Sequence, residues 1–137
     1  MALQSQTDPR SIIVDLCARF YDLGWVSGTG GGVSIRQGER VYMAPSGVQK
    51  ERLSIDDLFA VDTQGEILEP PKDPALRLSA CAPLFLNAFR LRDAGAVLHS
   101  HSLNAMLATL TTDGDVFRVT HLEMMKGIRG TGFHDTL

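Results

Sequence analysis

The sequence predicts an α/β fold in which helices pack on a mixed or antiparallel sheet. Segments with the apolar spacing of helices interleave with short segments typical of strands, and one pair of strands is joined by a tight turn. The 137 residues, 44% of them hydrophobic, suffice for one domain with a buried core. We see no internal repeat or linker, so we expect residues 1–137 to form a single domain.

The first expected element is an amphipathic helix. Asp8 is its expected N-cap, Pro9 stands in its first turn, and Gly24 marks its end. Apolar residues at helical spacing form one face: Ile12, Ile13, Leu16, Cys17, Phe20 and Leu23. Because Cys17 lies on this face, we expect a buried small hydrophobe rather than a reactive thiol.

A β-hairpin is expected next. Val33 and Ile35 alternate with polar residues, as do Val41 and Met43, and Gln37-Gly38-Glu39 supplies the turn between the two runs. The later elements follow in chain order: a capped turn at Ser54 to Asp57, strands in LFAVD (58–62) and EILEP (66–70), a loop at PPKDP (70–74), a helix at CAPLFLNAFRL (81–91), a strand at AGAVLHSH (94–101), a helix at LNAMLATL (103–110), a strand at VFRVTH (116–121), and a short helix or turn at LEMMKGI (122–128).

Composition excludes several classes of protein. The net charge is -3 and no run of Lys or Arg stands out, so we expect no nucleic-acid partner. No apolar stretch approaches the roughly 18 residues of a membrane span, and the N-terminus lacks the apolar segment of a signal peptide. The two cysteines, Cys17 and Cys81, are too few for a disulfide framework. We therefore expect a soluble cytoplasmic protein.

Two histidines stand one residue apart at the end of an apolar run. If GAVLHSHS (95–102) is a strand, His99 and His101 project from the same face and present two imidazoles to a metal ion. Histidines at this spacing also occur as hydrogen-bonded surface or core residues. The apolar lead-in favours the metal interpretation, because the pair then stands at the carboxyl end of a buried strand.

An acidic residue follows between apolar neighbours. Apolar surroundings disfavour the charged form of a carboxyl group, which would suit Glu123 to general acid–base catalysis. The alternative is an exposed carboxylate on a short helix, which the local sequence favours. His121 is a further candidate metal ligand, although a polar residue ending a strand is the simpler interpretation.

Two glycine-containing segments offer unobstructed backbone N–H groups. Ser27–Gly32 and the turn Pro45-Ser46-Gly47 could together cradle a phosphate group. Neither matches a nucleotide-binding motif, since a GxGxxG pattern would need glycine in place of Val33 and a strand before it. A flexible connection between helix and hairpin is the alternative for the glycine run.

Five motifs in this order resemble the class II aldolase and adducin-related family: GWVSGTGGGVSI, YMAPSGVQKE, SACAPLFLNAF, GAVLHSHS and THLEMMKGI. The similarity runs from about Asp8 to Leu137. It implies an α/β/α sandwich of three layers around a largely antiparallel central sheet. It also implies that residues 1–137 are the N-terminal part of the family's full domain, incomplete at the C-terminus.

The resemblance implies a zinc-dependent dehydration of 5-methylthioribulose 1-phosphate to 5-methylthio-2,3-dioxopentyl phosphate in methionine salvage. His99 and His101 are then two of three histidine ligands of a zinc ion, one per subunit, and Glu123 is the proton donor and acceptor. The metal would make the carbon beside the substrate ketone acidic. Cys81 matches a substrate-contacting cysteine. Homotetramers are implied, and the candidate phosphate-binding residues are Gly30, Gly31, Ser46, Gly47 and Ser79.

The third zinc histidine of the family is expected beyond Leu137. Neither His121 nor His134 matches it, and His134 in the GTGFHDTL tail is expected to be an exposed loop residue. Since a two-histidine site retains zinc less tightly than a site with three ligands, we expect this chain alone to be weakly active or inactive. Two alternatives stay open: an aldolase or epimerase acting on another sugar phosphate, and a non-catalytic interaction protein of the same fold.

Overall fold

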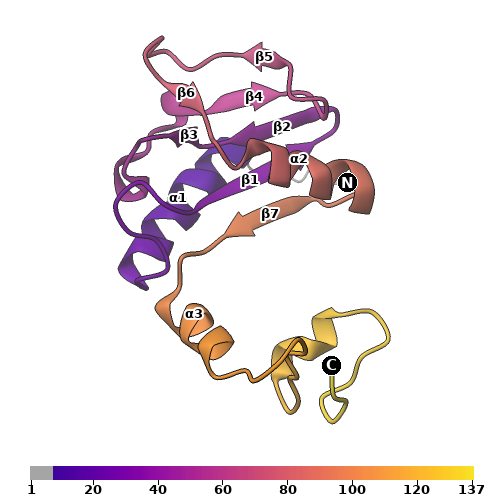
Figure 1. Cartoon of the computed structure of the whole chain (residues 1–137). Coiled ribbons are helices and arrows are strands. Elements are labelled where there is room, and N and C mark those ends of the chain that lie inside the picture. Colours follow the sequence, from indigo (N-terminus) through magenta and orange to yellow (C-terminus); the bar gives the residue numbers. More distant parts are fainter. Residues whose placement is uncertain (1–7) are drawn as a thin grey trace, which may run out of the picture. The chain divides into compact units, whose positions relative to one another are not determined.

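The computed structural model describes residues 8–137 of the chain (Figure 1). These residues form two compact units. The first unit ends at Ser102, and the second unit is Leu103–Leu137.

The first unit is built on an antiparallel sheet of five strands in the order β5-β4-β2-β1-β7. The strands are β1 (Gly32–Gln37), β2 (Arg40–Met43), β4 (Phe59–Val61), β5 (Ile67–Glu69) and β7 (Ala96–His99). The predicted hairpin is confirmed: Ile35 of β1 lies opposite Tyr42 of β2, and Gly38 adopts a positive φ of 60° in the turn. The strand pair predicted around Thr63-Gln64-Gly65 is also confirmed, as β4 and β5.

A helix covers each face of this sheet, which gives the expected three layers (Figure 1). The helices are α1 (Pro9–Asp22) and α2 (Ala82–Arg92). Because side chains alternate along a strand, β2 serves both faces: Tyr42 joins the core under α1, while Val41 and Met43 join the core under α2. The α/β fold predicted from the sequence, and the sandwich that the family resemblance implies, are therefore confirmed.

The ends of α1 are where the sequence places them. The Asp8 side chain accepts a hydrogen bond of 3.0 Å from the Arg10 amide, so it caps the first turn. Gly24 follows the helix with φ +68°, a conformation that glycine adopts without strain. On the buried face, Ile13 and Cys17 are fully enclosed.

Shorter elements connect the layers. They are β3 (Pro45–Ser46), β6 (Arg77–Leu78), and the 3-10 helices η1 (Lys50–Arg52) and η2 (Ile55–Asp57). β3 and β6 form a separate antiparallel pair. The capped turn predicted at Ser54 is confirmed, because its hydroxyl and its amide both donate to the Asp57 carboxylate, at 2.9 and 2.8 Å.

The second unit contains α3 (Leu103–Leu110) and the 3-10 helix η3 (Glu123–Gly127), both in segments predicted to be helical or turn-like. The strand predicted at 116–121 is wrong. Only an isolated bridge between Thr120 and Thr136 forms there, flanked by two backbone hydrogen bonds between Val119 and Leu137. A strand needs a partner along its length, and the backbone contacts of this segment are confined to its last three residues, Val119, Thr120 and His121.

None of the helices formed by residues 8–137 is long and apolar enough to cross a lipid bilayer.

Candidate functional site

The two predicted metal-ligating histidines lie at the carboxyl end of β7. His99 is the last residue of the strand, opposite Gly32 of β1. The prediction that His101 also lies on the strand is wrong, because its amide donates to the Trp25 carbonyl at 2.6 Å and the chain has left the sheet. The two rings nevertheless stay together, with centroids 4.7 Å apart and planes inclined at 59°.

His99 lies in a setting that favours its neutral form. Burial lowers the pKa of His99, and the neighbouring His101 ring lowers it further. The ring of Phe85, from α2, stands edge-on to His99 with centroids 6.3 Å apart. A metal ion binds the neutral imidazole, so these surroundings suit His99 to act as a ligand near neutral pH.

The glycine loop, residues Ser27–Gly32, packs directly against the histidine pair, His99 and His101. A Cβ atom added at Gly30 would lie 2.5 Å from Cε1 of His101, closer than van der Waals contact allows. One added at Gly31 would lie 2.9 Å from the backbone oxygen of His99, and Gly31 also has φ +72°. The close approach of the histidine segment therefore requires glycine at Gly31, and a side chain at Gly30 would displace the His101 ring, whether or not the two amides contact a phosphate group.

Lys50 joins the glycine loop to the second predicted phosphate-binding segment. Its side chain is buried, and Nζ donates hydrogen bonds of 2.9 Å to the carbonyl oxygens of Thr29 and Val48. Sequence reasoning missed this residue. Lys50 stands in the polar run Gln49–Arg52, which is typical of an exposed turn, so periodicity gave no signal for its burial.

The β3–β6 pair brings the segment that contains Ser46 next to the segment that contains Ser79 and Cys81. Pro45, beside Ser46, lies opposite Leu78, beside Ser79. The Ser79 hydroxyl accepts a hydrogen bond of 3.2 Å from the amide of Cys81 at the start of α2. Cys81 is half-buried and packs against the core under α2. It also lies close enough to Lys50 to raise the pKa of that lysine by charge interaction.

The donor set is compatible with part of a zinc site. Two imidazoles at this separation provide two of the nitrogen ligands that zinc prefers. Within residues 8–137, no group of three or more His, Cys, Asp or Glu side chains is placed to hold a metal ion. A zinc ion bound by His99 and His101 would therefore need at least one further ligand that residues 8–137 do not place beside them.

The predicted catalytic carboxylate belongs to the second unit. Glu123 begins η3, is exposed, and forms an ion pair of 2.5 Å with Lys126. Glu123 thus lies in the setting of the second interpretation, an exposed carboxylate on a short helix, and not in apolar surroundings. His121 has φ +56° and Nδ1 lies 2.9 Å from the Thr120 hydroxyl, while the exposed His134 ring lies with its centroid 5.2 Å from that of His121.

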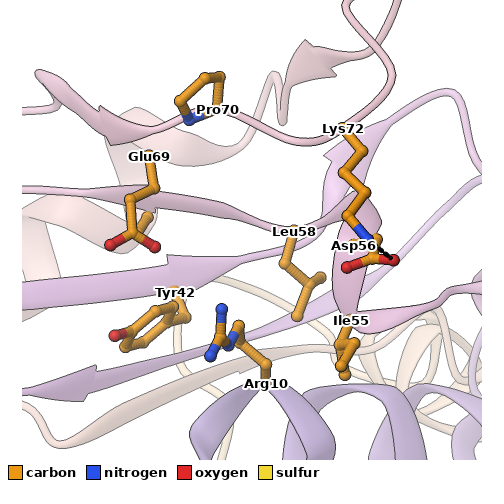
Figure 2. A pocket seen from close by; sticks show the side chains of 9 residues that line it. Arg10, Tyr42, Ile55, Asp56, Leu58, Glu69, Pro70 and Lys72 are labelled. Atoms are coloured by element: carbon orange, nitrogen blue, oxygen red, sulfur yellow. Dashed lines mark hydrogen bonds and ion pairs between the residues drawn. The ribbon is translucent and has the colours of Figure 1, made fainter.

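A separate pocket of about 180 Å³ lies between α1 and the sheet (Figure 2). The Arg10 guanidinium lies 5.8 Å from the centroid of the Tyr42 ring, and Lys72 forms an ion pair of 2.6 Å with Asp56. Arg10 is also paired, with Asp8. None of the residues predicted to carry chemistry lines this pocket, so it is not the site the sequence indicates.

Comparison with protein families matches residues 11–134 to the class II aldolase and adducin N-terminal domain. The chain belongs to this family. The match spans both units, including the histidine pair and Glu123.

Within the class II aldolase and adducin family, the chain is similar to proteins that share one name, and two of them show this. A protein named methylthioribulose-1-phosphate dehydratase from Aquarana catesbeiana is 57% identical over 122 residues, which are 88% of this chain and 51% of the relative. The protein of the same name from Danio rerio is 53% identical over 139 residues, covering 96% of this chain and 58% of the relative. The chain thus spans somewhat more than half the length of these relatives.

Solved structures support the fold. An L-fuculose-1-phosphate aldolase from Thermus thermophilus aligns with a TM-score of 0.67 and 24% identity, over 84% of this chain and 55% of the aldolase. A second L-fuculose 1-phosphate aldolase gives a TM-score of 0.67 and 22% identity, over 77% of this chain and 50% of that protein. At this identity the likeness concerns the class II aldolase fold alone.

Proposed function

We propose that this family member serves the zinc-dependent dehydration of 5-methylthioribulose 1-phosphate to 5-methylthio-2,3-dioxopentyl phosphate, a step of methionine salvage in the cytoplasm. One observation carries the proposal: the His99–His101 pair packs against the same glycine loop that Lys50 ties to the Ser46 segment. In this proposal, a metal-ligating pair and a phosphate cradle share one site. The names of the relatives from Aquarana catesbeiana and Danio rerio support this choice of reaction.

Each residue then has a chemical role. His99 and His101 hold zinc with a third histidine from outside residues 8–137. When bound, zinc supplies the Lewis acidity that makes the carbon beside the substrate ketone acidic. Glu123 takes the proton from C3 and assists departure of the C4 hydroxyl as water. Cys81 contacts the substrate, and the phosphate group is bound by Gly30, Gly31, Ser46, Gly47 and Ser79.

The proposal includes the organisation of the protein. Both units belong to one class II aldolase-like domain, of which residues 1–137 are the N-terminal part, and the family model that spans both units supports this. The complete domain assembles as a homotetramer with one zinc ion per subunit. A pair of histidines alone holds zinc weakly, so the proposed activity depends on a further zinc ligand besides His99 and His101.

A chimera tests the proposed function. The 137-residue chain is compared with the same chain extended by the part of the Danio rerio relative that lies beyond the matched region. We expect the extended protein to retain zinc and to form a product lighter than the substrate by one water molecule, and a chelator to abolish the reaction. Two carbon fragments would instead indicate an aldolase, and a metal-free protein indifferent to chelators would contradict the proposal.

Glu123→Gln in the extended protein tests the proton carrier. The amide keeps the size of the side chain but cannot take a proton, so we expect zinc content to be unchanged and turnover to fall by a factor of about 10² or more. Glu66→Gln, at an exposed carboxylate of the first unit, is the matched control. Unchanged turnover in Glu123→Gln would remove Glu123 from this role.

A further inference from the structure

Lys50 is unusual among the charged residues of the described chain. Its side chain is 2% exposed, and no other charged residue within 8–137 is buried. Burying an ammonium group is costly unless hydrogen bonds or an opposite charge compensate it. The position therefore needs a physical explanation beyond the folding of a polar turn.

The contacts of Lys50 supply only part of that compensation. Its Nζ atom donates to two carbonyl oxygens, of Thr29 and Val48, and no ion pair joins it to a carboxylate within the described residues. The ionisable groups that act on it are Cys17, Cys81 and Glu51. Burial outweighs their effect and lowers the pKa of Lys50. Within the described residues the ammonium group thus forms no ion pair, although the nearby Glu51 carboxylate favours its charged form.

The two carbonyl groups belong to the two loops that the sequence marks as phosphate-binding. Thr29 lies in the glycine loop, and Val48 follows Ser46 and Gly47. Because one nitrogen atom bonds both, the two carbonyl oxygens lie within about 5.8 Å of each other, twice the 2.9 Å bond length. The stem of the side chain also passes Gly32, whose added Cβ would lie 3.8 Å from Cε of Lys50.

We propose that Lys50 is a positioning residue that fixes the glycine loop and the Ser46–Val48 loop against each other and supplies positive charge to the phosphate site between them. The phosphate group of the substrate is then the ion-pair partner of Lys50. This inference rests on the proposed function, since it assumes that the two loops bind a sugar phosphate. A hydrogen-bonded cation both orders the loops before binding and attracts the dianion.

The test measures binding of inorganic phosphate to the chimeric protein, to two variants of Lys50 and to one control variant, by heteronuclear NMR titration. Lys50→Met keeps the length of the stem but removes the charge and the donors, and we expect binding to weaken about tenfold or more, as for the loss of a charged hydrogen bond. Lys50→Arg retains charge and donors and should recover most of the affinity. Lys72→Met, at an exposed lysine paired with Asp56, is the matched control and should bind like wild type.

The wild-type protein gives a second readout that needs no folded variant. Phosphate should shift the side-chain ammonium signal of Lys50 together with the backbone amides of Gly30 and Gly47. If Lys50→Met binds phosphate with wild-type affinity, the role of Lys50 is overturned. It is also overturned if phosphate shifts the backbone amide signals of the wild-type protein but not the ammonium signal of Lys50. Either result leaves the proposed function standing. Absence of any phosphate effect on wild type, in a protein that still dehydrates its substrate, overturns only the assignment of the two loops. Absence of both overturns the proposed function as well.

Discussion

The two units of the chain differ in how they enclose apolar residues. In the first unit, side chains of α1, α2 and the sheet form two buried cores, on either face of the sheet. In the second unit, Met125 is the one buried residue, while Met124 is 82% and Leu110 72% exposed. The first unit therefore has its own packed interior, and the second does not.

This difference shows what holds each unit in its conformation. Strands of the first unit pair over long sequence separations, as when Ile35 of β1 lies opposite Ala96 of β7. The helices α3 and η3 of the second unit rest mainly on hydrogen bonds between residues three or four apart, such as Met125 to Leu122. Local bonds without a core contribute little stability in water. We expect perturbations of equal chemistry to cost more in the first unit.

The largest expected effect is the loss of a buried aromatic side chain. Phe89 of α2 is 1% exposed, and Phe89→Ala should lower the free energy of unfolding by about 4 kcal/mol, because the substitution leaves a cavity in the core. The single tryptophan, Trp25, lies in the first unit, so its fluorescence during urea unfolding reports on that unit.

Phe117→Ala is the matched control in the second unit. Phe117 is 51% exposed, and its removal should lower the free energy of unfolding, followed for both variants by far-UV circular dichroism, by less than about 0.5 kcal/mol. Equal losses in the two variants would contradict the distinction between a packed and an unpacked unit.

The same contrast explains which elements could be predicted from sequence. Helix α1 was predictable because its cap at Asp8, its apolar stripe and its stop at Gly24 are all local signals. The β1–β2 hairpin was predictable because the turn and the alternation agree. Residues 116–121 carry the alternation of a strand, yet a strand also depends on a partner that local sequence does not reveal.

The next effect concerns glycines that are required for different reasons. Gly31 combines φ +72° with a virtual Cβ 2.3 Å from Val26 and 2.9 Å from the His99 carbonyl, so Gly31→Ala should cost the first unit about 3 kcal/mol. Gly114 has φ +91° and nothing within 4 Å of its virtual Cβ. Gly114→Ala, followed by far-UV circular dichroism, should cost less than Gly31→Ala because only the positive φ opposes it, and an equal cost in both variants would show that backbone strain alone decides.

The candidate site was predictable in its residue types but not in its connections. The spacing of His99 and His101 indicated a pair, and the glycine run indicated a backbone cradle. That Gly30 packs against the ring of His101 is a tertiary contact between segments about seventy residues apart, which no local pattern encodes. The burial of Lys50 was hidden for the same reason, since only the folded loops enclose it.

A smaller effect is expected at the N-cap of α1. Asp8→Ala removes the side chain that accepts from the Arg10 amide and should cost about 1 kcal/mol at neutral pH. Hydrogen bonding to Arg10 holds the pKa of Asp8 below its usual value. The stabilisation is therefore present above the unfolded-state pKa of about 4 and is lost as the pH falls through the lower folded-state value.

Asp8→Asn separates capping from charge. The amide still caps a helix but does not titrate, so its stability relative to Asp8→Ala should not vary between about pH 2 and pH 7, as followed by Trp25 fluorescence in urea. Wild type should lose its advantage over Asp8→Asn in acid. An advantage that persists below the folded-state pKa would show that the ion pair contributes nothing to the cap.

The smallest effect is expected at the Glu123–Lys126 ion pair of the second unit. The two side chains are 71% and 58% exposed, and such pairs contribute little because water screens them, so Glu123→Gln should change the unfolding free energy by less than about 0.5 kcal/mol. Glu69→Gln, which breaks the half-exposed pair with Arg40 on the sheet of the first unit, is the matched variant and should also have a small effect. Far-UV circular dichroism during urea unfolding follows both units. If Glu123→Gln keeps its stability and loses turnover, the lost turnover reflects the chemistry of the carboxylate and not unfolding. If Glu123→Gln unfolds more readily than Glu69→Gln, the stability of the second unit depends on the Glu123 charge, which the exposure of this side chain does not predict.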